Sequence, residues 1–335
     1  MQHGTSQTSA ERDEAFEARL NRVSFIVLVA FFVVAPLQPF VDIYPVFLMK
    51  ALCFGLFACA FNLLIGFGGL LSFGHAMFLG MAGYVSAYTA KSWGFTPEIA
   101  ILAGTAAATL LGIPTGLLAI RRQGIYFAMI TLALAQMVFF FCVQAPFTGG
   151  EDGIQGVPRG KLFGLLDLAP TMRMYFFVLA IFLAGFLLIY RIIHSPFGQV
   201  LKAIRENEPR AISLGYRTER YKLMAFVLSA ALAGLAGATK ALVFQLASLT
   251  DVHWTMSGEV VLMTLLGGLG TIFGPVIGAL VLASMEFYLA EIGSWVTIVQ
   301  GVIFVVCVLA FRRGILGELE AWLRRRPRKA PPAAR

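Results

Sequence analysis

The sequence predicts an all-α integral membrane protein with about ten transmembrane segments, in which glycine clusters interrupt two apolar stretches. Of its 335 residues, 59% are hydrophobic and only 13% are charged, whereas a soluble domain carries about 25% charged residues. Several apolar runs reach the roughly 20 residues that a helix needs to cross a bilayer. The basic residues gather in a few polar segments, as the positive-inside rule predicts for membrane proteins.

Eight apolar stretches contain the predicted spans, and polar tails flank them. The stretches cover residues 23–41, 46–90, 98–120, 125–145, 173–193, 222–246, 257–291 and 294–311. Residues 1–22 carry both signs of charge and lack the features of a cleaved secretory signal, so we expect a cytoplasmic tail there. The transmembrane domain is then 23–311, followed by a basic cytoplasmic tail at 312–335.

Positive charge sets the predicted orientation. Residues 191–222 hold seven basic residues against three glutamates, and the C-terminal tail is also basic, so both are placed in the cytoplasm. Arg121–Arg122 marks a tight cytoplasmic turn, and basic residues before the first span place the N-terminus on the same side. Stretches 46–90 and 257–291 must then begin and end outside.

These two stretches must fold back on themselves. One straight helix over 46–90 would be about 68 Å long, whereas the hydrocarbon core is about 30 Å thick. Glycine clusters mark the expected breaks, within Phe61–Tyr84 and Leu265–Leu280. The breaks occupy corresponding places in two halves, which indicates an internal repeat and, in a transporter, the translocation pathway. Whether 257–291 crosses twice or only re-enters stays open.

Glycine and polar residues in the two breaks are the predicted translocation-path residues. Broken backbone at membrane depth is tolerated only where protein or water satisfies its polar groups. The set comprises Asn62, Gly66, Gly68, Gly69, Ser72, His75, Gly267, Gly268 and Gly270. We expect the helix ends at these breaks to offer partial charges to a substrate. The alternative is a cytoplasmic turn with His75 near the interface, and the two roles can coincide.

Isolated polar residues near the predicted outer ends of the spans are expected to reach the interface. Lys240 and Gln245 fall near one such end, where a long side chain can extend toward water. Glu286 is placed at an outer interface as well. Carboxylates do not form a ladder through the spans, so the pattern does not predict a proton relay.

The polar segment Phe197–Leu223 reads as a folded knob rather than a loose loop. Gln199–Asn207 is compatible with a short helix, and Pro209 suits the first turn of a second helix with Asn207 or Glu208 near its cap. Gly215 suits the end of that helix. Two short helices joined by a turn indicate a docking element.

Several chemistries are excluded or disfavoured. Cys53, Cys59, Cys142 and Cys307 lie in apolar stretches without metal-ligand spacing, so no metal site is predicted. The chain has no phosphate-binding GxxxxGK[ST] loop and no catalytic constellation, so it is not predicted to be an enzyme. Its net charge of +8 is spread over loops and tails, which argues against nucleic-acid binding.

Three motifs in order resemble the LivM-type permease of branched-chain amino-acid ABC importers. They read GFGGLLSFGHAMFLGMAGY, RENEPRAISLGYRTERYKLMAFVLSAALAGLAGA and MTLLGGLGTIFGPVIGAL, within residues 45–290. The resemblance implies an importer-permease fold with a cytoplasmic coupling loop, here 194–221. It assigns ATPase coupling to Arg205, Glu206, Asn207, Glu208, Ala211 and Gly215. Pro209-Arg210 stands where many relatives have small or apolar residues.

The resemblance also implies partners and a location. It implies a multi-pass protein of the bacterial inner membrane, paired with a LivH-type homologous permease. Two cytoplasmic ATPase subunits would bind the ATP and Mg and drive alternating access. A periplasmic binding protein would deliver leucine, isoleucine or valine.

Two other functions remain open at this stage. The same architecture could import urea, short amides or other amino acids, because the binding protein largely sets substrate choice. A stand-alone channel or ion-coupled carrier would need a selectivity ring or coupling-ion carboxylates in its core, which the sequence does not show.

Overall fold

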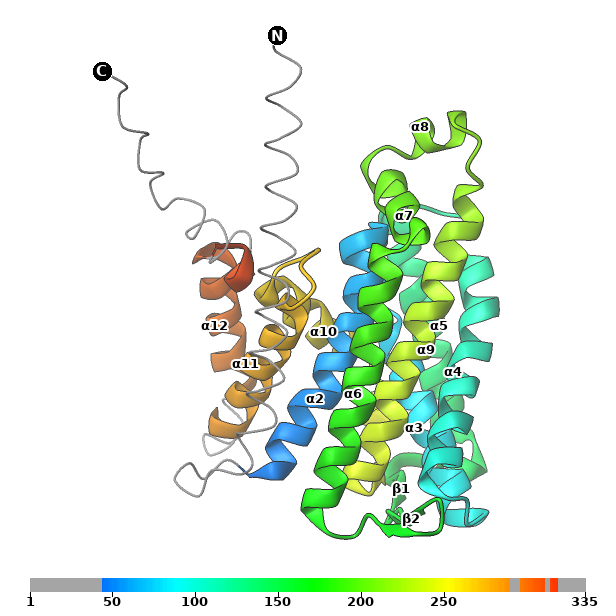
Figure 1. The fold of residues 1–335 in the computed structure, drawn as a ribbon, viewed down its shortest axis with the longest axis vertical. Helices are drawn as coiled ribbons and strands as arrows, with labels where there is room; N and C mark the ends of the chain where they lie inside the picture. Colours follow the sequence, from blue (N-terminus) through cyan, green and yellow to red (C-terminus); the bar gives the residue numbers. More distant parts are fainter. Residues whose placement is uncertain (1–43, 290–295, 311–313, 319–335) are drawn as a thin grey trace, which may run out of the picture.

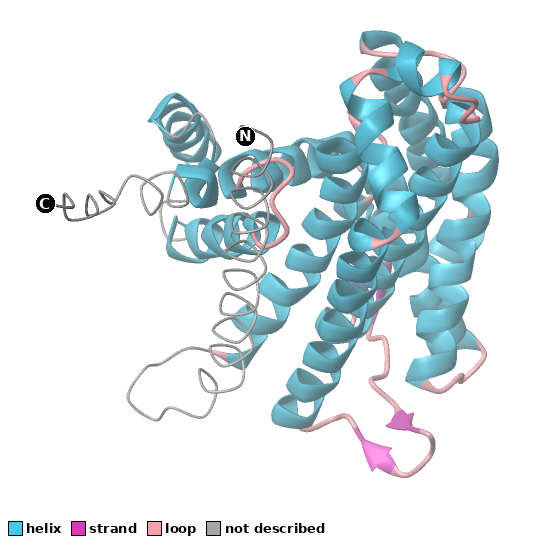
Figure 2. Cartoon of the chain, turned by 45° about the horizontal axis from the view of Figure 1, so that its top comes forward, coloured by secondary structure: helices cyan, strands magenta, loops and turns pink. Residues whose placement is uncertain are grey.

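The computed structural model describes residues 44–289, 296–310 and 314–318 (Figure 1). The first predicted span and both predicted tails, apart from 314–318, lie outside these residues. Within the described part, nine helices of 14 or more residues form one bundle (Figures 1 and 2). They are α2 (Pro45–Asn62), α3 (His75–Ser92), α4 (Pro97–Ala119), α5 (Ile125–Gln144), α6 (Thr171–His194), α9 (Thr218–Phe244), α10 (Trp254–Gly267), α11 (Gly274–Leu289) and α12 (Val296–Ala310).

Five segments in the described part are long and apolar enough to cross a membrane. They are Pro45–Phe67, which joins α2 to a π-helical turn, and the helices α4, α5, α6 and α9. The all-α membrane class is therefore confirmed. The total of ten spans stays a prediction, since the first predicted span is not among the described residues.

The chain breaks in both glycine-rich stretches. After α2 it makes the π-helical turn η2 (Leu63–Phe67), runs without helix through 69–74, and continues as α3. In the second stretch, residues 268–273 separate α10 from α11, which pack side by side. Helix α10 has 14 residues, about 21 Å, and so is shorter than the hydrocarbon core of about 30 Å.

Small residues bring α3, α4 and α9 together. Gly234 of α9 faces Ala108 of α4, and a Cβ placed on Gly237 would overlap the carbonyl of Leu79 in α3. Without a hydrophobic driving force between helices in lipid, close backbone approach of this kind supplies much of the packing energy. Gly237 therefore has no room for a side chain.

Replacing Gly237 by alanine should lower the stability of the protein. The new methyl group must push α9 away from α3, which for overpacked cores costs about 1–3 kcal/mol. Gly258→Ala is the matched control, since a Cβ at Gly258 meets no atom within 4 Å and alanine favours the helix by up to about 1 kcal/mol. Thermal unfolding in detergent measures both, and equal midpoints for the two variants would contradict this packing.

The end of the bundle opposite the knob carries a small ordered cap. The strand β1 (Ile154–Gln155) pairs antiparallel with β4 (Leu246–Ala247), and β2 (Lys161–Leu162) pairs with β3 (Leu166–Asp167). Three single 3₁₀ turns complete this end: η3 (Pro146–Thr148), η4 (Gly150–Asp152) and η5 (Leu249–Asp251). The cap ties the α5–α6 connection to the end of α9.

The predicted knob is folded. It consists of α7 (Pro196–Glu206) and α8 (Glu208–Ser213) and stands at the top of the bundle in Figure 1. Helix α7 begins three residues earlier than predicted, because Ser195 caps it and Pro196 fits its first turn. Asn207 caps α8 through its side chain, as the sequence suggested.

Candidate functional site

The first break is fastened by hydroxyl groups from two other helices. The N–H of Phe73 donates to Thr131 Oγ1 of α5 at 3.2 Å, and the N–H of Ala76 donates to Ser257 Oγ of α10 at 2.9 Å. Ser72 is fully buried beside them and accepts from the N–H of Gly74 at 3.2 Å. Three N–H groups at the start of α3 thus already have protein acceptors.

His75 is part of the same fastening. Its Nε2 lies 2.8 Å from Ser229 Oγ of α9, and that hydroxyl donates to the carbonyl of Ala60 at 2.6 Å. Since the hydroxyl proton is used on Ala60, Nε2 must be the protonated nitrogen of the ring. Nδ1 is then an acceptor, and it has no hydrogen-bond partner among the described residues. The imidazole is fully buried and its ring meets three others edge-on: Phe61, Phe78 and Phe226.

These bonds alter what the first break can do. In this arrangement three N–H groups at the start of α3 donate to side chains of the protein itself. They are therefore not free to bind a substrate in the way that the sequence had led us to expect. Ser72 and His75 are buried against protein and line none of the cavities described below. Their assignment to the path remains a prediction. In this structure they take part in the hydrogen bonds that connect the start of α3 to its neighbours, and we call the bonds of His75, Ser229 and Ala60 the His75 joint.

Removing the Ser229 hydroxyl should destabilise this joint. Ser229→Ala leaves both His75 Nε2 and the Ala60 carbonyl without their partner, at a cost of about 1–3 kcal/mol for each buried group. The control is Ser284→Ala, because Ser284 bonds only the carbonyl one turn earlier in α11. Thermal unfolding in detergent should show a clear loss for Ser229→Ala alone; similar losses for both would refute the joint.

Asn62 joins the two breaks. It is 2% exposed, and its Nδ2 donates to the carbonyl of Thr271 at 2.8 Å while its Oδ1 accepts from the N–H of Gly270 at 3.0 Å. The backbones approach closely here, since a Cβ on Gly66 would lie 2.8 Å from the nitrogen of Gly270. Three predicted path residues therefore meet at one point.

The glycines of the second break serve the same close approach. Gly268 and Gly270 have φ of +117° and +77°, a backbone conformation that favours glycine. A Cβ on Gly267 would overlap the carbonyl of Gly274. The turn between α10 and α11 is therefore too tight for side chains at these positions.

Arg205 connects the knob to this meeting point. Its guanidinium donates from Nη1 to the carbonyl of Gly66. Gly66 lies in the π-helical turn at the end of the helix, where backbone carbonyls lack the partner that a continuing helix would give them. Leu201 of the same helix packs on Gly68, and the Arg205 stem lies beside Gly69. Lys202 places its ammonium 5.5 Å from the centre of the Phe67 ring. Helix α7 thus sits directly on the first break.

The second helix of the knob is held through Glu208. Its Oε1 accepts from Lys222 of α9 at 2.6 Å, and its Oε2 accepts from Gln123 in the α4–α5 turn at 2.8 Å. Ala211 is the buried residue of α8. Gly215, with φ of +88°, ends α8 in a Schellman arrangement, where its N–H bonds the carbonyl of Ile212.

The outer face of the knob combines exposed apolar and charged side chains. Ile212, Leu214 and Tyr216 are 56%, 69% and 41% exposed. Glu206 and Arg210 are also exposed around α8. A patch of this composition on a polar end of the bundle has the mixture found in protein interfaces.

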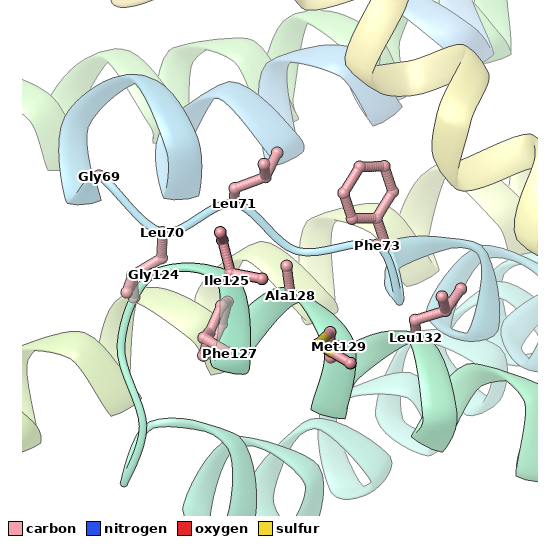
Figure 3. A pocket seen from close by; sticks show the side chains of 10 residues that line it. All are labelled: Gly69, Leu70, Leu71, Phe73, Gly124, Ile125, Phe127, Ala128, Met129 and Leu132. Carbon is pink, nitrogen blue, oxygen red and sulfur yellow. The ribbon is translucent and has the colours of Figure 1, made fainter.

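An apolar cavity opens beside the first break (Figure 3). It has a volume of about 450 Å³ and lies between the break segment Gly69–Leu71 with Phe73 and the start of α5. Ile125, Ala128, Met129 and Leu132 form the α5 side in Figure 3. Every residue lining it is apolar or glycine, so the cavity suits an aliphatic group.

Charged residues cluster near the opposite end of the bundle. Lys240 pairs with Asp251 and the two side chains are only 14% and 13% exposed. The chain reversal after α9 brings Asp251 back to Lys240, and the placement of Lys240 near the interface stays a prediction. Glu286 pairs with Lys50 of α2 at 2.5 Å. Sequence reasoning missed both partners, since neither lies near its counterpart along the chain.

No group of three metal-binding side chains occurs in the described part of the chain. The broken apolar helices and the folded knob are the architecture of a membrane permease subunit. A family model described as "Branched-chain amino acid transport system / permease component" matches residues 45–309. The chain belongs to this family, which confirms the resemblance drawn from the motifs.

The curated relatives are also named as permease proteins. The chain is 29% identical over 283 residues to the high-affinity branched-chain amino acid transport system permease protein LivM of Escherichia coli, covering 76% of this chain and 65% of the relative. It is 28% identical to the ribose import permease protein RbsC of Bacillus subtilis, over 66% of this chain and 70% of that protein. A probable LivH permease of Methanocaldococcus jannaschii is 25% identical, over 70% of this chain and 79% of the relative. No solved structure shows a significant match.

Proposed function

We propose that this chain is the membrane-spanning permease subunit of an ATP-driven ABC importer for branched-chain amino acids. It works in the bacterial inner membrane with both termini in the cytoplasm. Its partners are a LivH-type homologous permease, two cytoplasmic ATPase subunits that bind ATP and Mg, and a periplasmic binding protein. Family membership and the LivM and LivH relatives support this assignment.

One contact carries the mechanism: Arg205 of the knob bonds the carbonyl of Gly66 in the first break. An ATPase that binds the exposed face of α8 and moves it would pull on α7, because the knob is folded as one unit. Through Gly66, and through Asn62 beside it, the movement reaches both breaks. The knob is therefore the proposed coupling element, and the breaks are its proposed hinges.

The breaks give alternating access a place to bend. Straight helices resist bending because every backbone group is paired, whereas a break held by side chains can exchange one set of bonds for another. The apolar cavity beside Gly69 and Leu71 offers an aliphatic substrate a matching wall. Movement at Gly66 would change the position of this wall relative to α5.

Purification of the tagged chain from its native membrane tests the assembly. The proposal expects ATPase subunits and a second permease to co-purify, and expects ATP-dependent leucine uptake after reconstitution with the binding protein. Ile212→Ser combined with Leu214→Ser should release the ATPases while leaving the permease pair intact. The control is Leu165→Ser, an 87% exposed residue at the opposite end. Uptake without ATP, or of urea but not leucine, would overturn the proposal.

A further inference from the structure

Five charged side chains from five elements gather near the end of the bundle that bears the strands. They are Lys50 in α2, Lys240 in α9, Asp251 in η5, Glu259 in α10 and Glu286 in α11. The two ammonium groups lie 5.7 Å and 5.2 Å from the centre of the same Phe54 ring. Glu259 interacts electrostatically with the other four. Charges within apolar spans are costly and commonly mark a functional site.

The cluster has capacity left for a ligand. Its two lysines pair with Asp251 and Glu286, and Glu259 has no hydrogen-bond or ion-pair partner among the described residues. Lys50 and Lys240 each donate one hydrogen bond to a carboxylate, whereas an ammonium group carries three donors. The cluster can therefore take one more ammonium and still offer donors to one more carboxylate.

A cavity exposes part of this cluster. It has a volume of about 520 Å³, and the Lys50–Glu286 pair lies in its wall. The other lining side chains are apolar or aromatic, among them Tyr44, Phe47, Phe244 and Phe287. Opposite charges beside an apolar wall match an α-amino acid with an aliphatic side chain.

We propose that this cavity is an outer binding site for a zwitterionic, aliphatic amino acid. The ligand's carboxylate binds the ammonium of Lys50, and its ammonium binds the carboxylate of Glu286. One ion pair is exchanged for two, and the net charge of the cluster is unchanged. The choice of ligand rests on the proposed function. Uncharged amides such as urea form no ion pairs, so their binding would not offset the free energy of separating Lys50 from Glu286.

A second zwitterion has the same pairing chemistry: the headgroup of phosphatidylethanolamine. The amino acid is favoured because its branched aliphatic side chain would fit in the cavity, against the aromatic side chains beside Lys50 and Glu286. The test includes the lipid as an outcome.

A photoreactive diazirine analogue of leucine can test the site in the reconstituted complex. The expected result is covalent labelling of peptides from Pro45–Asn62 or Gly274–Leu289, competed by leucine and unchanged when phosphatidylethanolamine is left out of the vesicles. Lys50→Met with Glu286→Gln should reduce labelling about tenfold, the effect of losing one charge-assisted hydrogen bond. Removing both partners keeps the fold, because neither charge is left unpaired.

The matched control removes the other ion pair. Lys240→Met with Asp251→Asn deletes the same charges from the same cluster but leaves the cavity wall intact, so labelling should persist. Labelling that survives Lys50→Met/Glu286→Gln, that falls elsewhere, or that appears only without phosphatidylethanolamine would overturn the site. A complex that fails to take up leucine at all would instead refute the proposed function.

Discussion

Asn62→Leu should abolish leucine uptake and strongly reduce the amount of assembled complex. The leucine leaves the N–H of Gly270 and the carbonyl of Thr271 without partners, and each unsatisfied buried group costs about 1–3 kcal/mol. The two lost hydrogen bonds connect the first break to the second, so both halves of the bundle are destabilised. Uptake into vesicles, normalised to the amount of chain, and thermal unfolding in detergent measure the effect.

A graded series separates the loss of the two Asn62 hydrogen bonds from a general loss of packing. Asn62→Asp keeps the shape and the acceptor for Gly270, and a carboxyl that takes up a proton in this buried place can still donate to Thr271, so an intermediate effect is expected. Gly66→Ala should reproduce the loss from the other side, since its Cβ would overlap the Asn62 side chain. If Asn62→Leu behaved like Asn62→Asp, the two bonds would not be the cause.

Arg205→Met should uncouple ATP hydrolysis from transport. The variant keeps the α7 helix and its apolar contacts but loses the bond to the Gly66 carbonyl. A charge-assisted bond is worth about 1.5–3 kcal/mol, and because Arg205 is largely exposed we expect the lower end, an uptake about tenfold slower. ATPase activity of the assembled complex should remain. The ratio of leucine imported to ATP hydrolysed is the measurement.

Arg220→Met provides the control for charge at the same end of the bundle. Arg220 is exposed in the first turn of α9, and its side chain has no hydrogen-bond partner among the described residues. Arg205→Lys should restore part of the ratio, because a lysine retains a charged donor of shorter reach. An unchanged ratio in Arg205→Met would show that the knob acts through other contacts.

The sequence predicted the elements better than the contacts between them. Both breaks follow from glycine content and from stretches too long for one crossing, and the knob follows from Pro209 and Gly215. These are local signals, in which a residue's own backbone preference decides the structure. The orientation argument gave the Arg121–Arg122 turn, which Gln123 joins to the knob at the same end.

The fastening residues carry no such signal. Thr131, Ser229 and Ser257 are single hydroxyl groups in apolar helices, and their role depends on which helix faces which break. Asn62 could be predicted as a site residue because it is polar within an apolar stretch. Its two partners could not, because they lie 208 and 209 positions away. The pairing of Lys240 with Asp251 likewise requires knowing how the chain turns after α9.

The distances along the chain between these partners bear on how the protein is made. The hydroxyl group that bonds His75 comes 154 residues later in the chain, and the one that accepts from the N–H of Ala76 comes 181 residues later. While the ribosome is still synthesising the second half, the first break sits in the bilayer with polar groups that its own half cannot satisfy. The early helices must therefore be inserted in a provisional state, and the last of their hydrogen bonds form only after α10 and the turn beyond it have entered the membrane.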